Sequence, residues 1–165
     1  MKKIIVIGCP GSGKSTFAKK LNKILNIPVI HLDLIWNKSD KTTITREEFD
    51  EKLSEIFNME SWIIDGNYQR TIEKRVENCD TIFLLDYSLE TCLLGAYSRV
   101  GQKRDDMPWK EDELDENFKQ FIIKFSEENL PQIYKIIDKY KDKKNIIIFK
   151  NREEADLYLA SLKNE

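Results

Sequence analysis

The segment Gly8–Ser15, with the sequence GCPGSGKS, constrains the fold of this chain more than any other feature. It fills every required position of the pattern G-x-x-x-x-G-K-[S/T], follows the apolar run IIVI, and precedes an amphipathic stretch. Glycine lets consecutive backbone N–H groups turn toward one phosphate, and a helix that begins directly after the loop adds partial positive charge there. The segment therefore predicts a buried strand, a phosphate-binding loop and a helix in immediate succession.

Two residues of this loop carry side chains suited to a nucleoside triphosphate. In such loops the lysine neutralises the outer phosphates, and the hydroxyl residue that follows it binds Mg²⁺. Lys14 is therefore a predicted catalytic residue and Ser15 a predicted metal ligand, with ATP and Mg²⁺ as the expected cofactors. The predicted nucleotide-binding residues of the loop are Gly8, Cys9, Pro10, Gly11, Ser12, Gly13, Lys14, Ser15 and Thr16.

Along the rest of the chain, short apolar runs alternate with amphipathic stretches, which is typical of an α/β protein with a parallel sheet. The predicted strands span residues 3–7, 28–32, 62–65, 81–86 and 145–149. The predicted helices span residues 14–25, 46–58, 71–78, 89–100, 114–140 and 153–162. The longest of these helices contains Pro131, so we expect it to break into two segments.

The composition narrows the class of protein. The 165 residues fit one domain, and the net charge of −2, with both signs scattered along the chain, argues against direct nucleic-acid binding. Three isolated cysteines form no zinc-binding pattern and suit a reducing compartment. The apolar run near the start is too short for a signal sequence or a membrane span. We therefore expect a cytoplasmic protein without a membrane segment.

One stretch is irregular by its sequence, GQKRDDMPWKEDE at 101–113, because it combines many charges with glycine and proline. We expect a mobile surface loop there. The predicted organisation is a single domain over 1–165, with an acceptor-binding insert at about 33–60 and a short lid at about 99–113.

Candidate residues for a phosphate acceptor follow the second predicted strand. Asp33 comes directly after it, at the carboxyl edge where open α/β sheets bind ligands. This carboxylate is suited to deprotonate an acceptor hydroxyl or to anchor Mg²⁺, and a helix or turn cap is its structural alternative. Trp36 either stacks on a ring of the acceptor or fills a hydrophobic gap. His31 is interpreted as a packed or hydrogen-bonded core residue.

Arginines at five positions, 46, 70, 75, 99 and 104, suit phosphate, because a guanidinium group binds phosphate oxygens in pairs and stabilises a transferring phosphoryl group. Arg99 and Arg104 flank the charged loop and are predicted catalytic residues. Arg46, at the start of a predicted helix, and Arg70, after the segment DGNYQ, are predicted to bind the acceptor. The structural alternative for each is an ordinary solvated surface arginine.

Several segments together resemble the adenylate-kinase-related family of DNA topology modulation (FlaR-like) proteins, over nearly the whole chain. These segments are GCPGSGKST, HLD with the W that follows, WIIDGNYQRT, TIFLLD, the R…KRDDM loop and NIIIFKNREE. The resemblance implies a three-layer P-loop NTPase of the nucleotide-kinase type. Its α/β fold would have a five-stranded parallel sheet in the order 2-3-1-4-5, with helices on both faces.

The same resemblance implies roles for particular residues. It implies that the loop near 150–152, with Asn151 and Arg152, approaches the adenine of the nucleotide. More distantly, IIDGNYQR is similar to the DGFPR segment of adenylate kinases. That likeness implies that Asp65 lies beside Mg²⁺ and that Arg70 binds an acceptor phosphate.

Two predicted strands end in an aspartate, Asp65 and Asp86, and in the implied order both flank the strand before the phosphate loop. Asp86 leads into Ser88, a suitable helix cap, which gives this carboxylate a structural alternative. Asp65 is followed by Gly66 and Asn67, which suit a close approach to phosphate. We therefore expect Asp65 to reach Mg²⁺ through water, and Gly66 and Asn67 to contact the acceptor.

These features favour a kinase-like enzyme that transfers the γ-phosphate of ATP to a nucleotide-like or other small-molecule acceptor. Catalysis would rest on positioning and charge neutralisation. The alternative is a nucleotide-binding regulator linked to DNA topology or gene expression, with weak or no kinase activity. The pattern leaves the oligomeric state open.

Overall fold

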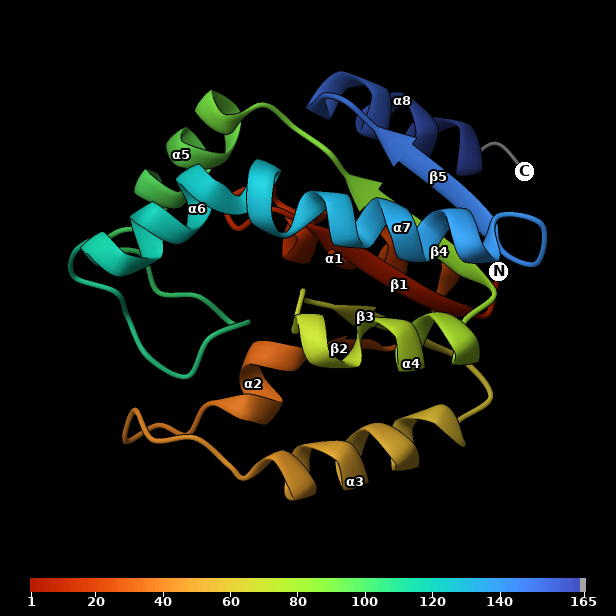
Figure 1. The fold of residues 1–165 in the computed structure, drawn as a ribbon, viewed down its shortest axis with the longest axis horizontal. Coiled ribbons are helices and arrows are strands. Elements are labelled where there is room, and N and C mark those ends of the chain that lie inside the picture. The colour runs from red at the N-terminus through yellow and green to blue at the C-terminus, as the bar shows by residue number, and fades with distance from the viewer. Residues whose placement is uncertain (164–165) are drawn as a thin grey trace.

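The central strand β1 (Lys3–Gly8) carries an unbroken apolar run, and Ile4, Ile5, Val6 and Ile7 are fully buried. A run without a polar position has to be covered on both faces, so strands pair with both of its edges and helices cover both sides of the sheet. In the computed structural model, which describes residues 1–163, five parallel strands form one sheet in the order β2-β3-β1-β4-β5 (Figure 1). This arrangement confirms the predicted α/β fold and strand order.

The remaining strands are short; β3 and β4 are buried on either side of β1, whereas the edge strands β2 and β5 are only partly buried. Each runs parallel to its neighbour, and the pairing places the carboxyl ends of β1 and β4 side by side, with Gly8 opposite Leu85. The register of β1 with β3 likewise brings Val6 opposite Asp65. The bounds are β2 Val29–His31, β3 Trp62–Asp65, β4 Thr81–Leu85 and β5 Asn145–Phe149.

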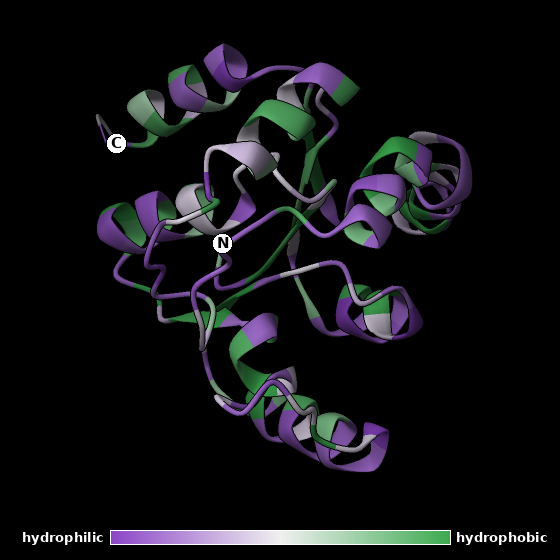
Figure 2. Cartoon of the chain, turned by 90° about the vertical axis from the view of Figure 1, so that its left-hand side faces the viewer, coloured by the Kyte–Doolittle hydropathy of each residue, from purple (hydrophilic) through white to green (hydrophobic). Residues whose placement is uncertain are grey.

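Helices cover the two faces of the sheet. Helix α1 contacts β1, β3 and α8 on one side, whereas α4 contacts β1 and α7 on the other, which Figure 1 shows as one layer behind the sheet and one in front. Figure 2 shows hydrophobic colour along the strands and hydrophilic colour on much of the helical surface. The bounds are α1 Lys14–Leu25, α2 Leu32–Trp36, α3 Arg46–Phe57, α4 Ile72–Asn78, α5 Leu89–Tyr97, α6 Glu116–Glu128, α7 Leu130–Tyr140 and α8 Arg152–Leu162.

Local signals at the helix ends act as the sequence indicates. Thr45 and Glu48 form a reciprocal capping box at the start of α3, with Oγ1 of Thr45 3.1 Å from the Glu48 amide nitrogen. Ser88 caps α5 by accepting from the Thr91 amide at 3.2 Å. Pro131 separates α6 from α7 by standing in the first turn of α7, where no backbone N–H is required.

The second strand is shorter than expected, and a helix that the sequence analysis did not predict replaces its end. Strand β2 pairs with β3 only as far as His31, because β3 ends at Asp65 and Gly66 turns the chain away with a φ of 125°. Leu32 therefore has no strand partner and begins the short helix α2. As a correction, Asp33 lies in the first turn of α2 rather than just past a strand end.

The predicted lid region is irregular, as expected. Helix α5 ends at Tyr97, three residues earlier than predicted, and α6 begins at Glu116. Within the described residues, 98–115 contain turns and bends but neither helix nor strand. In Figure 1 this segment projects on the side to which the strand arrowheads point. It therefore stands beside the carboxyl edge of the sheet, where the phosphate loop also lies.

Candidate functional site

The phosphate loop and the first turn of α1 present backbone N–H groups that are available to bind a ligand. Four other helices, α3, α5, α6 and α8, have a side chain that accepts from a first-turn amide. The N-cap of α1 is Gly13, with a φ of 95° and no side-chain acceptor. Its first-turn amides therefore remain free to bind an anion, and the helix dipole favours negative charge at that point.

Neighbouring elements hold the loop in this shape through close contacts. Gly11 has a φ of 83°, and a Cβ placed on it would lie 1.9 Å from the carbonyl oxygen of Cys92 in α5. On the opposite side, the Asn67 side chain accepts from the Gly8 amide at 3.1 Å and donates to the Gly8 carbonyl at 2.6 Å. Asn67 was predicted to contact an acceptor, and its side-chain amide braces the phosphate loop.

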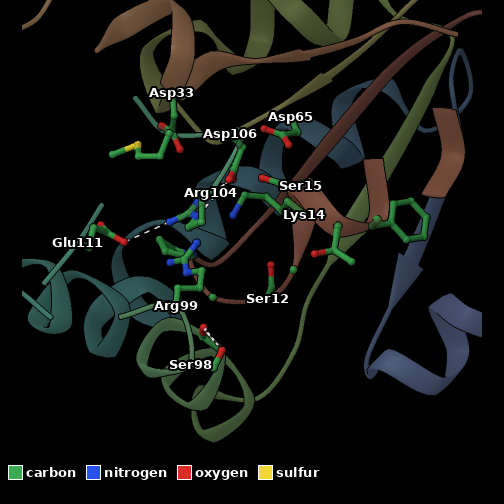
Figure 3. A pocket seen from close by; sticks show the side chains of 18 of the residues that line it. Ser12, Lys14, Ser15, Asp33, Asp65, Ser98, Arg99, Arg104, Asp106 and Glu111 are labelled. Carbon is green, nitrogen blue, oxygen red and sulfur yellow. Dashed lines mark hydrogen bonds and ion pairs between the residues drawn. The ribbon is translucent and has the colours of Figure 1, made fainter. Parts of the chain in front are cut away.

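Lys14 extends from the loop into the cavity shown in Figure 3. Its Nζ donates to the carbonyl oxygen of Cys9 at 3.1 Å, which folds the side chain back over the loop. Burial lowers the pKa of Lys14, while the nearby carboxylates of Asp65 and Asp33 oppose this shift. A desolvated ammonium group with carboxylates nearby is suited to receive the phosphates of a nucleotide.

Two aspartates face Lys14 from the carboxyl edge of the sheet (Figure 3). Asp65 is 3% exposed, and its Oδ2 lies 2.7 Å from Nδ1 of His31. Burial lowers the pKa of His31, but the hydrogen bond with Asp65 and the negative charge of that carboxylate together raise it, and the net shift is upward. His31 is therefore a hydrogen-bonded interior residue that orients the Asp65 carboxylate.

Asp33 lies on the side of the cavity away from the phosphate loop. Its Oδ1 accepts a hydrogen bond of 2.7 Å from the hydroxyl of Tyr68. Burial raises the pKa of Asp33, and the hydrogen bond from Tyr68 and the charge of Lys14 partly oppose this. A carboxyl group with a raised pKa at the edge of a cavity has the properties of a general base.

The irregular segment 98–115 brings a third carboxylate into the site, which the sequence analysis missed. Asp106 is 5% exposed, and it accepts from Nε of Arg104 at 3.0 Å and from Nη2 at 2.6 Å. Arg104 also donates to Glu111 at 3.2 Å. Arg99 points into the same space, and its buried Nε has no hydrogen-bond partner among the described residues. The only sequence signal for Asp106 was its place in the segment RDDM.

A cavity of about 1140 Å³ joins these groups. It is large enough for a nucleotide and a small acceptor together, since ligand pockets typically measure about 300–1,000 Å³. Most of the predicted site residues line it. They are Pro10, Gly11, Ser12, Gly13, Lys14, Ser15, Thr16, Asp33, Asp65, Gly66, Asn67, Arg99, Arg104 and Arg152.

The other predicted site residues lie outside the cavity wall. Gly8 and Cys9 stand behind the loop, and Cys9 is buried. Trp36 packs edge-on against Phe49 and Tyr68, with centroid distances of 5.5 Å and 6.1 Å. Trp36 therefore fills a hydrophobic gap, the structural alternative stated for it.

Three predicted polar residues also lie outside the wall. Arg70 forms a double hydrogen bond with Asp50, at 2.9 Å and 2.7 Å, on the molecular surface. Arg46 is exposed at the start of α3. Asn151 caps α8 by accepting from the Glu154 amide at 2.9 Å, so only its neighbour Arg152 reaches the cavity.

Asp86, the other aspartate at a strand end, has structural partners. Its Oδ2 accepts from the Tyr134 hydroxyl at 2.5 Å and pairs with Lys150. It does not belong to the cavity wall. Asp86 thus ties β4 to α7 and to the end of β5.

The oxygen donors around Ser15 fit a hard cation such as Mg²⁺. The Ser15 hydroxyl lies between the carboxylates of Asp65 and Asp106 in Figure 3. Mg²⁺ ordinarily takes one or two carboxylates and completes its shell with phosphates and water. Over residues 1–163, no group of three or more His, Cys, Asp or Glu residues is arranged to hold a metal by itself. The two carboxylates beside the Ser15 hydroxyl fit a cation that completes its shell with nucleotide phosphates and water.

The sheet order and the phosphate loop define a P-loop kinase-like fold, and solved structures of this fold are similar over nearly the whole chain. Shikimate kinase from Acinetobacter baumannii in complex with shikimate has a TM-score of 0.64 and 17% identity, covering 100% of this chain and 95% of that one. A gluconokinase from Sinorhizobium meliloti 1021 has a TM-score of 0.57 and 14% identity, covering 99% and 94%. At these identities the likeness shows the fold alone.

A family model described as chromatin associated protein KTI12 matches residues 1–84, about half of the chain. The chain belongs to this family. The adenylate kinases of Thermotoga petrophila and Thermotoga maritima are each 30% identical over 88 residues, which is 52% of this chain and 39% of theirs. The chain therefore spans about two fifths of the length of these curated relatives. The structure has no helix among its described residues that is long and apolar enough to span a membrane.

Proposed function

We propose that this protein is an ATP- and Mg²⁺-dependent phosphotransferase that acts on a small-molecule acceptor. The observation that carries the proposal is the shared cavity, in which Lys14 of the phosphate loop faces Asp33 across the carboxyl edge of the sheet. The uncapped start of α1 supports a nucleotide phosphate on one side of this cavity. The kinase names of the structural and sequence relatives support the same class of reaction.

We further propose that the phosphate goes to a hydroxyl group, as in a nucleoside or another small hydroxyl compound. The two arginines expected on an acceptor phosphate, Arg46 and Arg70, do not line the cavity, whereas Asp33 does. A phosphate acceptor is already anionic and needs guanidinium partners, whereas a hydroxyl acceptor benefits from a base. The acceptor side therefore suits a neutral hydroxyl better than a second phosphate.

Each residue of the site has a distinct part in this reaction. Asp33 accepts the proton of the acceptor hydroxyl while the acceptor oxygen forms a bond to the γ-phosphorus. At the same time the bond between the γ-phosphorus and the β–γ bridging oxygen breaks, and ADP is the leaving group. Lys14, Arg99 and Arg104 stabilise the charge that develops on the transferring group. Ser15 and Asp65 would hold Mg²⁺, directly and through water, and when bound the ion neutralises phosphate charge.

The direct test is ADP release with ATP and Mg²⁺ over a panel of nucleosides, small polyols and hydroxy acids, and nucleoside monophosphates. We expect acceptor-dependent turnover in the hydroxyl group of the panel, and its loss in Asp33→Asn. Turnover with monophosphates alone, unchanged in Asp33→Asn, would reject the hydroxyl acceptor but keep the phosphotransferase. Absence of acceptor-dependent turnover over the whole panel would reject the phosphotransferase itself.

A second candidate function is a nucleotide-dependent regulator of a chromosomal process. The family description, chromatin associated protein, favours it, as does the resemblance to DNA topology modulation proteins. The net charge of −2 makes a protein partner more suitable than direct DNA contact. DNA binding at low salt that changes with ATP would support the direct form, and absence of any DNA binding under those conditions would exclude it.

A further inference from the structure

Asp106 stands out within the lid because it is the one buried residue in the described stretch 98–115. Its neighbour Asp105 is exposed and pairs with Lys19 of α1. The two adjacent aspartates of the segment RDDM therefore point to different surroundings. One faces solvent at the rim, and the other lies inside the cavity beside the phosphate loop.

The contacts of Asp106 hold it beside the phosphate loop. Its carboxylate accepts two hydrogen bonds from the Arg104 guanidinium, at 3.0 Å and 2.6 Å, and the residue is 5% exposed. Figure 3 shows the carboxylate of Asp106 and the hydroxyl of Ser15 turned toward each other. A carboxylate that is 91 positions away in the sequence thus meets the residue expected to bind Mg²⁺.

A serine hydroxyl has one hydrogen to donate and lone pairs with which to accept or to bind a cation. When a carboxylate takes that hydrogen, the lone pairs of the oxygen are directed away from the carboxylate. Figure 3 shows the side chains of Lys14 and Asp65 around the same hydroxyl. The arrangement orients the Ser15 oxygen for a cation bound with the nucleotide phosphates.

Two further polar groups in the same cavity support the binding of a ligand there. The Ser12 side chain is 2% exposed, and its hydroxyl has no hydrogen-bond partner among the described residues. Nε of Arg99 is likewise buried without a partner. Buried polar atoms without partners are rare in folded proteins, so these two support a polar ligand between the loop and the lid.

We propose that Asp106 is a positioning residue that joins the lid to Ser15 and makes Mg²⁺-dependent nucleotide binding depend on lid closure. This inference rests on the proposed function, because it requires ATP and Mg²⁺ at the phosphate loop. Arg104 has two roles here. It fixes Asp106 through their ion pair, and it brings a positive charge toward the phosphates. The consequence is that the lid closes most stably when metal and nucleotide are both present.

The test measures ATP affinity by calorimetry, with Mg²⁺ and with EDTA, for the wild-type protein, Asp106→Asn and the matched control Asp105→Asn. We expect Mg²⁺ to tighten ATP binding in the wild type and in Asp105→Asn. In Asp106→Asn this enhancement should fall by about tenfold, the usual effect of removing a partner that orients a metal ligand. Affinity in EDTA should stay close to that of the wild type, which separates the effect from misfolding.

Limited trypsin cleavage at the lid residues Lys103 and Lys110 gives a second readout without activity. Mg²⁺ with ATP should protect the lid in the wild type and in Asp105→Asn, and protect it less in Asp106→Asn. A double-mutant cycle with Ser15→Ala completes the test. If Asp106 acts through Ser15, Asp106→Asn causes no further loss of the Mg²⁺ enhancement in the Ser15→Ala background.

Three results would overturn the inference. Equal Mg²⁺ enhancement in Asp106→Asn and Asp105→Asn would show that Asp106 does not position the metal site. A full additional loss in the Ser15→Ala background would show that it acts through another group, and parallel loss of affinity in EDTA would show a merely structural role. If the wild-type protein does not bind ATP at all, the proposed function itself is rejected. This outcome is seen in the wild-type measurement alone, before any variant is compared.

Discussion

The hydroxyl of Tyr68 lies 2.7 Å from Oδ1 of Asp33 and donates a hydrogen bond to it. Tyr68 adopts a φ of 38°, a left-handed conformation that is unusual for an aromatic residue. Arg75, fully buried in α4, holds this conformation by donating to the carbonyl oxygens of Gly66, Asn67 and Tyr68. A structural arginine thus fixes the loop that orients the proposed base.

Asp33→Asn should abolish most turnover while stabilising the fold. Loss of a general base lowers kcat by about 10²–10⁴-fold, and acceptor binding should change little because Asn keeps the shape. Burial raises the pKa of Asp33 in the folded state, so its ionised form opposes folding at neutral pH. We therefore expect a gain on the order of 1 kcal/mol at pH 7 that disappears below about pH 4, where Asp33 is protonated in both states.

Thermal unfolding of Asp33→Asn and the wild type at both pH values, together with steady-state kinetics, checks this prediction. Asp112→Asn, an exposed carboxylate of the lid rim, is the matched control and should leave stability unchanged. An unchanged kcat in Asp33→Asn would remove Asp33 from the chemistry.

Tyr68→Phe should move the acid limb of the pH–rate profile upward. The hydrogen bond from Tyr68 favours the ionised form of Asp33, so its removal raises the pKa of Asp33 further. The carboxylate then becomes available only at higher pH, so the acid limb moves toward neutral pH. The measurement is kcat/KM as a function of pH, and an acid limb that coincides with that of the wild type would contradict the prediction.

Arg75→Met should destabilise the protein strongly, although Arg75 itself does not line the cavity. Arg75 donates to four carbonyl oxygens, of which that of Tyr68 keeps a hydrogen bond from the Thr71 amide at 2.9 Å. Methionine of similar length removes the Arg75 donors from the carbonyls of Gly66 and Asn67. Each buried acceptor without a partner costs about 1–3 kcal/mol, so we expect a total loss of at least about 2 kcal/mol. Urea unfolding measures it, with exposed Lys74→Met as the control, for which we expect a change within about 0.5 kcal/mol.

Gly95→Ala should weaken both stability and nucleotide binding, although alanine in an exposed helix would add about 1 kcal/mol. A Cβ on Gly95 would lie 1.9 Å from the carbonyl oxygen of Gly11, so α5 and the phosphate loop have to separate. Gly101→Ala is the control, because its φ of 75° carries backbone strain but its Cβ meets open space. It should lower stability modestly and leave ATP affinity unchanged, whereas a more stable Gly95→Ala would refute the contact.

Arg70→Ala and Asp50→Ala should have equal and small effects. Their side chains are 44% and 39% exposed, and ion pairs of this kind contribute less than about 1 kcal/mol. Neither residue lines the cavity, so the KM for the acceptor should not change in either variant. A rise in KM for Arg70→Ala alone would mean that Arg70 leaves Asp50 and binds the acceptor during turnover.

Local patterns in the sequence were enough for most of the framework. The phosphate loop, the helix after it and the buried central strand follow from residues within one short segment, because loop spacing and hydrophobic periodicity are local properties. The strands 62–65 and 145–149 and the helix 14–25 agree with β3, β5 and α1 to the residue. The strand order came from a resemblance and not from periodicity, and the structure confirms it.

The tertiary structure determined which polar residues face the cavity and which have structural partners. Arg70 pairs with Asp50, 20 positions earlier, and β2 ends where β3 no longer offers a partner, so Asp33 enters a helix. Asp106 lies beside Ser15 because the segment 98–115 returns to the cavity that the phosphate loop lines. The sequence by itself determined that this chain has a phosphate-binding loop on a parallel sheet. Only packing between distant segments determined which charges face the cavity, because a charged side chain pairs with groups that are close in space, whatever their distance in the sequence.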